Sequence, residues 1–144
     1  MIHLPDLVVL LTVLLLLAVT SLTGRARGKY GIRAPATSGH PMFERTYRIQ
    51  MNTLEHTVMF LPALWLAARW GNPAWAGILG LVWIVGRIWY VPAYLREPAA
   101  REKPFALAAF ALLLLVVLAV WGVIRLFVLQ PLGRFRFATS RPPR

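Results

Sequence analysis

Four long apolar segments constrain the fold of this chain more than any other feature. They cover residues 4–22, 43–70, 74–94 and 104–129. Each reaches or exceeds the ~20 residues that an α-helix needs to cross ~30 Å of hydrocarbon. With 58% hydrophobic residues and a mean hydropathy of +0.62, the chain is too apolar for an ordinary soluble domain. We therefore predict an all-α, multi-pass integral membrane protein with one domain over residues 1–144.

The segments between the predicted helices favour an up-down-up-down four-helix bundle. A basic loop that contains Gly and Pro is expected over residues 24–42. The Gly-Asn-Pro sequence at 71–73 predicts a tight turn, which makes the second and third helices antiparallel. Pro104 suits the first turn of the last helix, and the basic tail at 131–144 is expected to be irregular.

The first apolar segment could be mistaken for a secretory signal. Its N-terminal side, however, carries His3 and Asp6 rather than Lys or Arg. Its apolar run is also longer than the hydrophobic region of a signal peptide. We expect this segment to be a retained helix.

The placement of the basic residues argues against nucleic-acid binding, although the net charge is +11. Nine of them follow the first or third helix on one side of the membrane, and the positive-inside rule assigns that side to the cytoplasm. These nine are Arg25, Arg27, Lys29, Arg33, Arg45, Arg48, Arg96, Arg101 and Lys103. Four arginines of the tail fall on the other side and weaken this orientation without reversing it. Anionic lipids or an anionic small molecule are the partners that such charges favour.

The chain contains no cysteine, which excludes disulfides, thiolate metal sites and a cysteine nucleophile. Any thiol chemistry must therefore use the thiol of a bound ligand. The three histidines show no metal-ligand spacing, so no metal is expected. Only two of the sixteen basic residues are lysines, which favours a GC-rich bacterial source and hence the inner membrane.

Polar residues in the second segment indicate a functional site. Glu44, Arg48, Asn52 and Glu55 share one face of a helix at i, i+4, i+8 and i+11. Ionisable side chains inside a membrane-spanning helix are costly and usually face a bundle interior or a wet cavity. Glu55 lies ~16 Å along the helix from Glu44 at ~1.5 Å per residue, well below the interface.

Each of these polar groups also has a purely structural interpretation. Arg45 and Arg48 could extend to the lipid headgroups. Glu55 could form an ion pair with Arg87 of the third helix. The neighbouring His56 could be a hydrogen-bonded packing residue.

A second polar group lies near the cytoplasmic end of the third segment. Arg87, Tyr90 and Tyr94 share a face at i, i+3 and i+7. An aromatic belt at the membrane surface is the alternative for the tyrosines.

These motifs together resemble the MAPEG family, the membrane-associated proteins in eicosanoid and glutathione metabolism. The resemblance is carried by the run at 43–55, Phe-Glu-Arg-Thr-Tyr-Arg-Ile-Gln-Met-Asn-Thr-Leu-Glu. It continues from Gly86-Arg87 through Tyr90 and Tyr94 to Arg101, and covers about residues 25–105. A motif of this length, followed by a second block at the right spacing, is specific.

The resemblance implies a homotrimer of four-helix subunits that binds glutathione between neighbouring subunits, near the cytoplasmic face. Arg101 matches the arginine that stabilises the glutathione thiolate in the family. The residues that match glutathione contacts are Arg27, Arg48, Gln50, Asn52, Glu55, Tyr90 and Tyr94. His56 stands at a contact position where the eicosanoid-pathway members have tyrosine. Gly28 replaces a family arginine with a proposed role at the lipid substrate, so no particular eicosanoid activity follows.

We therefore predict a membrane-bound glutathione transferase of the detoxification type. It would conjugate glutathione to an apolar electrophile, or reduce a lipid hydroperoxide, and the second substrate would enter from the bilayer. A non-enzymatic lipid-binding or scaffold member of the family is the main alternative. A small channel is a further one, although no pair of broken helices supports a permeation site.

Overall fold

The computed structural model describes the backbone of residues 3–137 and the side chains of residues 3–128. All regular secondary structure in this part of the chain is helical, as predicted. The four long helices are α1 (Leu4–Tyr30), α2 (Pro41–Leu66), α3 (Pro73–Arg96) and α4 (Glu102–Phe137). Two short elements, the π-helical turn η1 (Ala67–Gly71) and the 3₁₀ turn η2 (Ala99–Arg101), precede α3 and α4.

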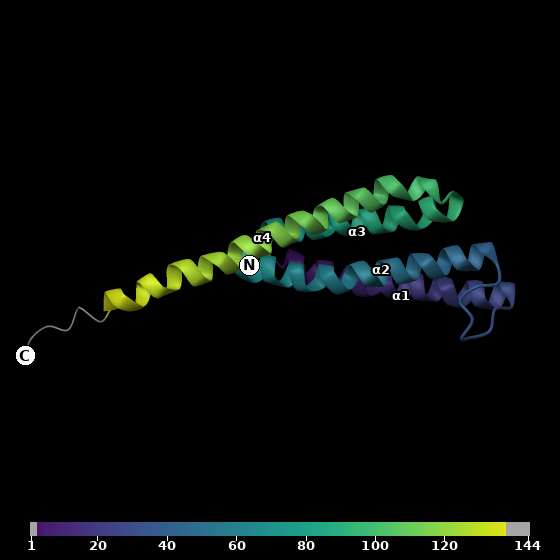
Figure 1. Cartoon of the computed structure of the whole chain (residues 1–144), viewed down its shortest axis with the longest axis horizontal. Coiled ribbons are helices and arrows are strands. Elements are labelled where there is room, and N and C mark those ends of the chain that lie inside the picture. The colour runs from purple at the N-terminus through teal and green to yellow at the C-terminus, as the bar shows by residue number, and fades with distance from the viewer. Residues whose placement is uncertain (1–2, 138–144) are drawn as a thin grey trace, which may run out of the picture.

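The helices form two antiparallel pairs, α1 with α2 and α3 with α4 (Figure 1). The α1–α2 loop and η2 lie at the same end of the molecule, which we call the loop end. The N-terminus lies toward the opposite end, where α1 begins. Beyond that end, α4 continues alone, past the other three helices (Figure 1).

Helix α1 is longer than predicted, and the basic loop is correspondingly shorter than 24–42. The helix continues to Tyr30, and Gly24 and Gly28 lie within its regular turns. It ends at Gly31, whose φ of 66° is left-handed and whose backbone N–H donates to the Arg27 carbonyl. A glycine in this conformation is a common helix terminator, since it has no Cβ to clash. Several of the predicted loop cations therefore lie on the last helical turns.

Helix α4 also extends past its predicted end at 129. It runs through Pro131 to Phe137, so the prediction of an irregular tail from 131 is wrong for these residues. Leu, Arg and Phe dominate the residues after Pro131 and are compatible with a helix. Residues 138–144 of the predicted tail lie outside the described part of the chain.

The tight turn before α3 is confirmed. The α-helical part of the second segment ends at Leu66 rather than at 70, and η1 completes it. The Asn72 side-chain oxygen then accepts hydrogen bonds from the backbone N–H groups of Ala74 and Trp75, at 3.0 and 3.1 Å. This N-cap, followed by Pro73 at the first helical position, starts α3.

Three of the described helices, not the predicted four, are long and apolar enough to cross a membrane. They are Leu4–Tyr30, Pro73–Arg96 and Ala99–Val128. Helix α2 has the length, with 26 residues, but its polar side chains lower its mean hydropathy. Since α2 joins the loop end of α1 to the far end of α3, it must traverse the same thickness. Large apolar side chains such as Val58 and Trp121 are exposed on the outside of the bundle, as a lipid-facing surface requires.

Close packing between the helices fixes the positions of the polar residues. Phe60 of α2 and Trp83 of α3 stack with their ring centroids 3.9 Å apart. Gly86 of α3 faces α4 so closely that a Cβ there would lie 3.0 Å from the backbone nitrogen of Ala108. Small residues allow such close approach of helices in membranes. The α3 residues that follow Gly86 are consequently held against both α2 and α4.

Candidate active site

A buried arginine joins the polar faces of α2 and α3. Arg87 is 0% exposed. Its Nη2 donates hydrogen bonds to Asn52 Oδ1 at 3.0 Å and to Thr53 Oγ1 at 2.8 Å. The guanidinium also lies 4.6 Å from the centroid of the Tyr90 ring. Arg87 thereby sets the orientation of Asn52 and the position of Tyr90.

The alternative ion pair between Glu55 and Arg87 is not formed. Among the residues with described side chains, the one ion pair is His3–Asp6. Glu55 is exposed, whereas Arg87 turns toward the Asn52 amide and the Thr53 hydroxyl. Neutral oxygens inside the bundle accept hydrogen bonds from the Arg87 guanidinium. The Glu55 carboxylate therefore stays free for another partner.

Next to Arg87, five of the predicted site residues line one pocket, which we call the polar pocket. Its volume is about 530 Å³. The five predicted residues are Arg48, Asn52 and Glu55 of α2, Tyr90 of α3 and Arg101 of η2. Residues that are far apart in the sequence thus meet near the loop end of the bundle.

Arg101 lies over Tyr94, one of two neighbouring tyrosines. Its guanidinium carbon lies 4.6 Å from the centroid of the Tyr94 ring, and the Tyr94 and Tyr90 rings are 5.6 Å apart. A guanidinium over an aromatic face is favourable and limits the side chain to few positions. Tyr94 itself lines an adjoining pocket of about 400 Å³, and Arg48 lies in the walls of both pockets.

Two residues of the polar pocket were not predicted. Glu102 and Phe105, both in the first turn of α4, complete its lining. The Phe105 ring lies 6.5 Å from Tyr90 and 5.1 Å from His56, centroid to centroid. Neither Glu102 nor Phe105 forms part of the matching motif. Only their closeness to Arg101 in the sequence could have indicated that they line the pocket.

His56 does not line the polar pocket. It is 8% exposed and packs edge-on against Phe105, behind the pocket wall. Its Nδ1 has no hydrogen-bond partner among the described residues. The structure therefore places His56 in contact with a pocket residue rather than in the pocket.

Arg27 and Gln50 lie apart from the other predicted site residues. Arg27 Nη1 donates to the Ala36 carbonyl at 2.8 Å, and its guanidinium lies 4.8 Å from the centre of the Phe43 ring. Gln50 Nε2 donates to Thr20 Oγ1 of α1 at 3.4 Å. Gln50 follows Arg48 by two residues and so projects from roughly the opposite side of α2. Within one chain, neither Arg27 nor Gln50 lines the polar pocket.

The polar pocket combines groups that recognise a zwitterionic small molecule. Two guanidinium groups can bind carboxylates, and two carboxylates can bind an ammonium group. The Tyr90 hydroxyl and the Asn52 amide add neutral hydrogen bonds. No cluster of three or more potential metal ligands occurs in the described part of the chain. The chemistry that these residues can support is the binding of a charged small molecule and the stabilisation of an anion beside Arg101.

Comparison with known proteins confirms the resemblance seen in the motifs. The sequence matches the MAPEG family over residues 6–121. Human microsomal glutathione S-transferase 2 is 38% identical over 105 residues, which is 73% of this chain and 71% of that protein. Bovine leukotriene C4 synthase is 38% identical over 103 residues, covering 72% of this chain and 69% of the synthase.

A bacterial relative matches a larger part of the chain. An uncharacterized protein of Synechocystis sp. is 43% identical over 131 residues, 91% of this chain and 94% of that protein. The match of residues 6–121 includes every residue that lines the polar pocket. With its apolar helices and this match over most of its length, the chain is an integral membrane protein of the MAPEG family.

Proposed function

We propose that this protein is a membrane-bound glutathione transferase that activates glutathione in the polar pocket. The observation that carries the proposal is the convergence of Arg48, Asn52, Glu55, Tyr90 and Arg101 on one pocket. The printed names of two relatives, a glutathione S-transferase and leukotriene C4 synthase, support the same chemistry.

The charges of the pocket match those of glutathione, which has two carboxylates and one ammonium group. Arg48 binds one carboxylate, Arg27 of a neighbouring subunit binds the other, and the free Glu55 carboxylate binds the ammonium group. A cation near the sulfur stabilises the thiolate, the reactive form. A free thiol has a pKa near ~8.5, and lowering it by ~2 units takes about 2.7 kcal/mol. Arg101 supplies this stabilisation, because η2 holds its guanidinium at the pocket wall over Tyr94.

In the reaction, the thiol proton leaves to water and the thiolate sulfur forms a bond to an electrophilic carbon. The electrophile then releases its leaving group with the bonding electron pair or, in an addition, takes up a proton. Apolar electrophiles concentrate in the bilayer, so the second substrate reaches the site laterally from the lipid. The same thiolate would also reduce a lipid hydroperoxide: the sulfur attacks the terminal peroxide oxygen, the lipid alcohol leaves, and a second glutathione converts the sulfenic acid to glutathione disulfide and water. In a bacterium, the protein would lie in the inner membrane with the site at the cytoplasmic face, as a detoxification enzyme.

A homotrimer completes the site in this proposal. Arg48 and Glu55 are exposed in the single chain, so one side of the polar pocket lacks a wall. Arg27 and Gln50 belong to the site by resemblance, but within their own chain Arg27 bonds to the Ala36 carbonyl of the loop and Gln50 bonds to Thr20 of α1. A neighbouring subunit would bring its own Arg27 and Gln50 to the open side of the pocket.

Complementation between two inactive chains tests the shared site. A chain with Arg27→Ala keeps its own Arg101, and a chain with Arg101→Ala keeps its own Arg27. If the site lies between subunits, mixed trimers contain some sites with both arginines, so co-expression restores turnover above that of either variant alone. If the site lies within one chain, no intact site can form and turnover stays low.

Glutathione titration of the purified protein tests the proposed function without a guess about the second substrate. The ultraviolet absorbance of the thiolate is recorded at neutral pH. Because the chain has no cysteine, any thiolate signal belongs to the ligand. A saturable signal is expected. No binding at millimolar glutathione would refute the enzyme and favour a non-enzymatic lipid-binding or scaffold protein of the same family.

A further inference from the structure

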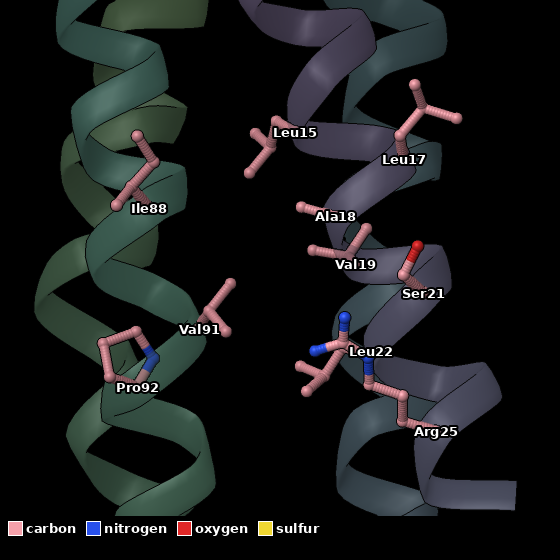
Figure 2. A pocket seen from close by; sticks show the side chains of 10 residues that line it. All are labelled: Leu15, Leu17, Ala18, Val19, Ser21, Leu22, Arg25, Ile88, Val91 and Pro92. Atoms are coloured by element: carbon pink, nitrogen blue, oxygen red, sulfur yellow. The ribbon is translucent and has the colours of Figure 1, made fainter.

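An apolar crevice separates α1 from α3 on a different side of α3 from the polar pocket. It has a volume of about 620 Å³. Figure 2 shows its lining, with α1 contributing one wall and Ile88, Val91 and Pro92 of α3 the other. Arg25 is the one charged residue among the residues that line it. We call this feature the α1–α3 crevice.

The length of the α1–α3 crevice corresponds to one leaflet of a bilayer. Its lining on α1 extends from Leu15 to Arg25, about 15 Å along the helix axis at ~1.5 Å per residue. This is half of the ~30 Å hydrocarbon thickness. Arg25 lies about 31 Å along α1 from Leu4, so it reaches the membrane surface at the loop end when Leu4 lies at the other surface.

Arg25 is directed into this crevice and has no partner there. Figure 2 shows its side chain turning back along α1, with the guanidinium between α1 and α3 at the level of Val91 and Pro92. Within the part of the chain whose side chains are described, it forms no hydrogen bond and no ion pair. A guanidinium at the mouth of an apolar cleft favours an anionic ligand with an apolar tail.

Two further cations lie beside the crevice. A neighbouring pocket of about 440 Å³ shares Pro92 with it and is lined by Arg96 and Lys103, together with Glu102. The positive charge therefore continues from Arg25 toward the surface of the bundle at the loop end. A ligand whose charged group lies at this level is attracted by more than one cation.

We propose that the α1–α3 crevice is a binding site for one anionic phospholipid of the leaflet at the loop end. One acyl chain lies along the apolar walls from Val91 toward Leu15, and the phosphate accepts hydrogen bonds from Arg25. The lipid fills the space between the two helix pairs and thereby stabilises their arrangement. This site is independent of glutathione, and its test does not depend on the proposed enzymatic activity.

Native mass spectrometry of lipids retained by the full chain tests the proposal. The protein is reconstituted in vesicles of equal parts phosphatidylglycerol and phosphatidylcholine, and then extracted in mild detergent. We expect the wild type to retain phosphatidylglycerol preferentially. In Arg25→Gln, the ratio of retained phosphatidylglycerol to phosphatidylcholine should fall about tenfold, the loss expected for one charge-assisted contact. Arg33→Gln removes an exposed loop arginine that lines no described pocket and should leave the ratio unchanged.

Filling the crevice tests the apolar half of the site. Ala18 lines the crevice, so Ala18→Trp should abolish retention of both lipids. Leu14→Trp places the same side chain one turn away, outside the crevice lining, and should retain lipid as the wild type does. Ala18→Leu repeats the test with a smaller side chain if the tryptophan variant does not purify as a helical protein.

Two results would overturn the proposal. An unchanged lipid ratio in Arg25→Gln would show that the guanidinium does not bind the headgroup. Unchanged retention in the Ala18 variants would show that the lipid lies elsewhere. If Ala18→Trp instead alters the oligomeric state while lipid retention stays constant, a second copy of the chain occupies the crevice.

Discussion

The polar pocket and the α1–α3 crevice are both cavities beside α3, yet one lining is mainly polar and the other mainly apolar. The polar pocket contains two arginines, two carboxylates, an amide and a tyrosine hydroxyl. The crevice is apolar except for Arg25 and Ser21. Tyr90 faces the first cavity, while Val91 and Pro92, roughly 100° and 200° further around the helix, face the second.

The difference shows what the packing of α3 contributes to each cavity. On the polar side, Gly86 brings α3 close to α4, and Arg87 bonds to α2. Those contacts help to place six polar groups around one space. On the crevice side, α3 meets α1 through apolar side chains that leave a gap one leaflet long. The first arrangement suits a charged substrate and the second suits a lipid tail, so changes on one side should leave the other side intact.

The largest effect should come from Arg101→Ala. Loss of the guanidinium removes the stabilisation of the thiolate, and turnover at neutral pH should fall about 100-fold, equivalent to about 2.7 kcal/mol. The variant should recover activity as the pH rises, because the thiol of bound glutathione then ionises without help. Turnover with a soluble model electrophile, measured against pH, checks this.

Arg96→Ala is the matched control for Arg101→Ala. Arg96 lies at the end of α3, near η2, but does not line the polar pocket. Its removal should change turnover less than twofold, as is usual for exposed charges away from a site. Equal losses in the two variants would indicate a general effect of surface charge rather than a thiolate contact.

A smaller effect is expected for Arg87→Met, which removes the donor that orients Asn52. Glutathione should bind about tenfold more weakly, because the amide is no longer held in one orientation. Calorimetric titration with glutathione measures this. Thr53→Val removes the other hydrogen bond of Arg87 but alters no residue of the pocket lining. It should change the affinity less than threefold, and a larger loss would mean that Arg87 acts through the packing of α2.

Neutralising each carboxylate of the polar pocket in turn shows which one binds the ammonium group of glutathione. Glu55→Gln should weaken glutathione binding about fivefold, since it replaces a charged acceptor by a neutral one of the same shape. Glu102→Gln alters the second carboxylate of the same pocket and should have a weaker effect. If the order of the two effects is reversed, the ammonium group is bound at α4 and the orientation of glutathione differs from the proposal.

The smallest effect concerns independence of the two cavities. Arg25→Gln should leave glutathione affinity within about twofold of the wild type, because Arg25 lines only the crevice. The same calorimetric titration measures it. A clear loss of glutathione affinity would show that the cavities are coupled through α3, and the separation argued above would be wrong.

Several features of the fold and the site follow from local patterns. The apolar segments predict the number of helices, and the Gly-Asn-Pro turn predicts the antiparallel arrangement of α2 and α3. The spacing of Arg48, Asn52 and Glu55 predicts that they share one face, and all three line the polar pocket. Such predictions work because helical period and chain length depend only on neighbouring residues.

Predictions failed where packing between helices decides the outcome. The partner of Arg87 could not be deduced, since Asn52, Thr53 and Glu55 all lie within reach along α2. The predicted end of α1 was wrong by eight residues, because its polar last turns are stabilised as a helix rather than as a loop. His56 shares its helix with the pocket residues, but the position of Phe105 on α4 separates it from the polar pocket.

By itself, the sequence determined that this protein is helical, lies in a membrane and belongs to the MAPEG family. Apolar length and motif spacing are properties of the chain alone. Tertiary structure decided which of the motif residues meet, and it separated Arg27 and Gln50 from the rest. Tertiary structure also creates the α1–α3 crevice, which no sequence motif predicts. The reason is physical: a cavity is the space that packed helices leave between them, so it depends on how they cross and not on any one segment.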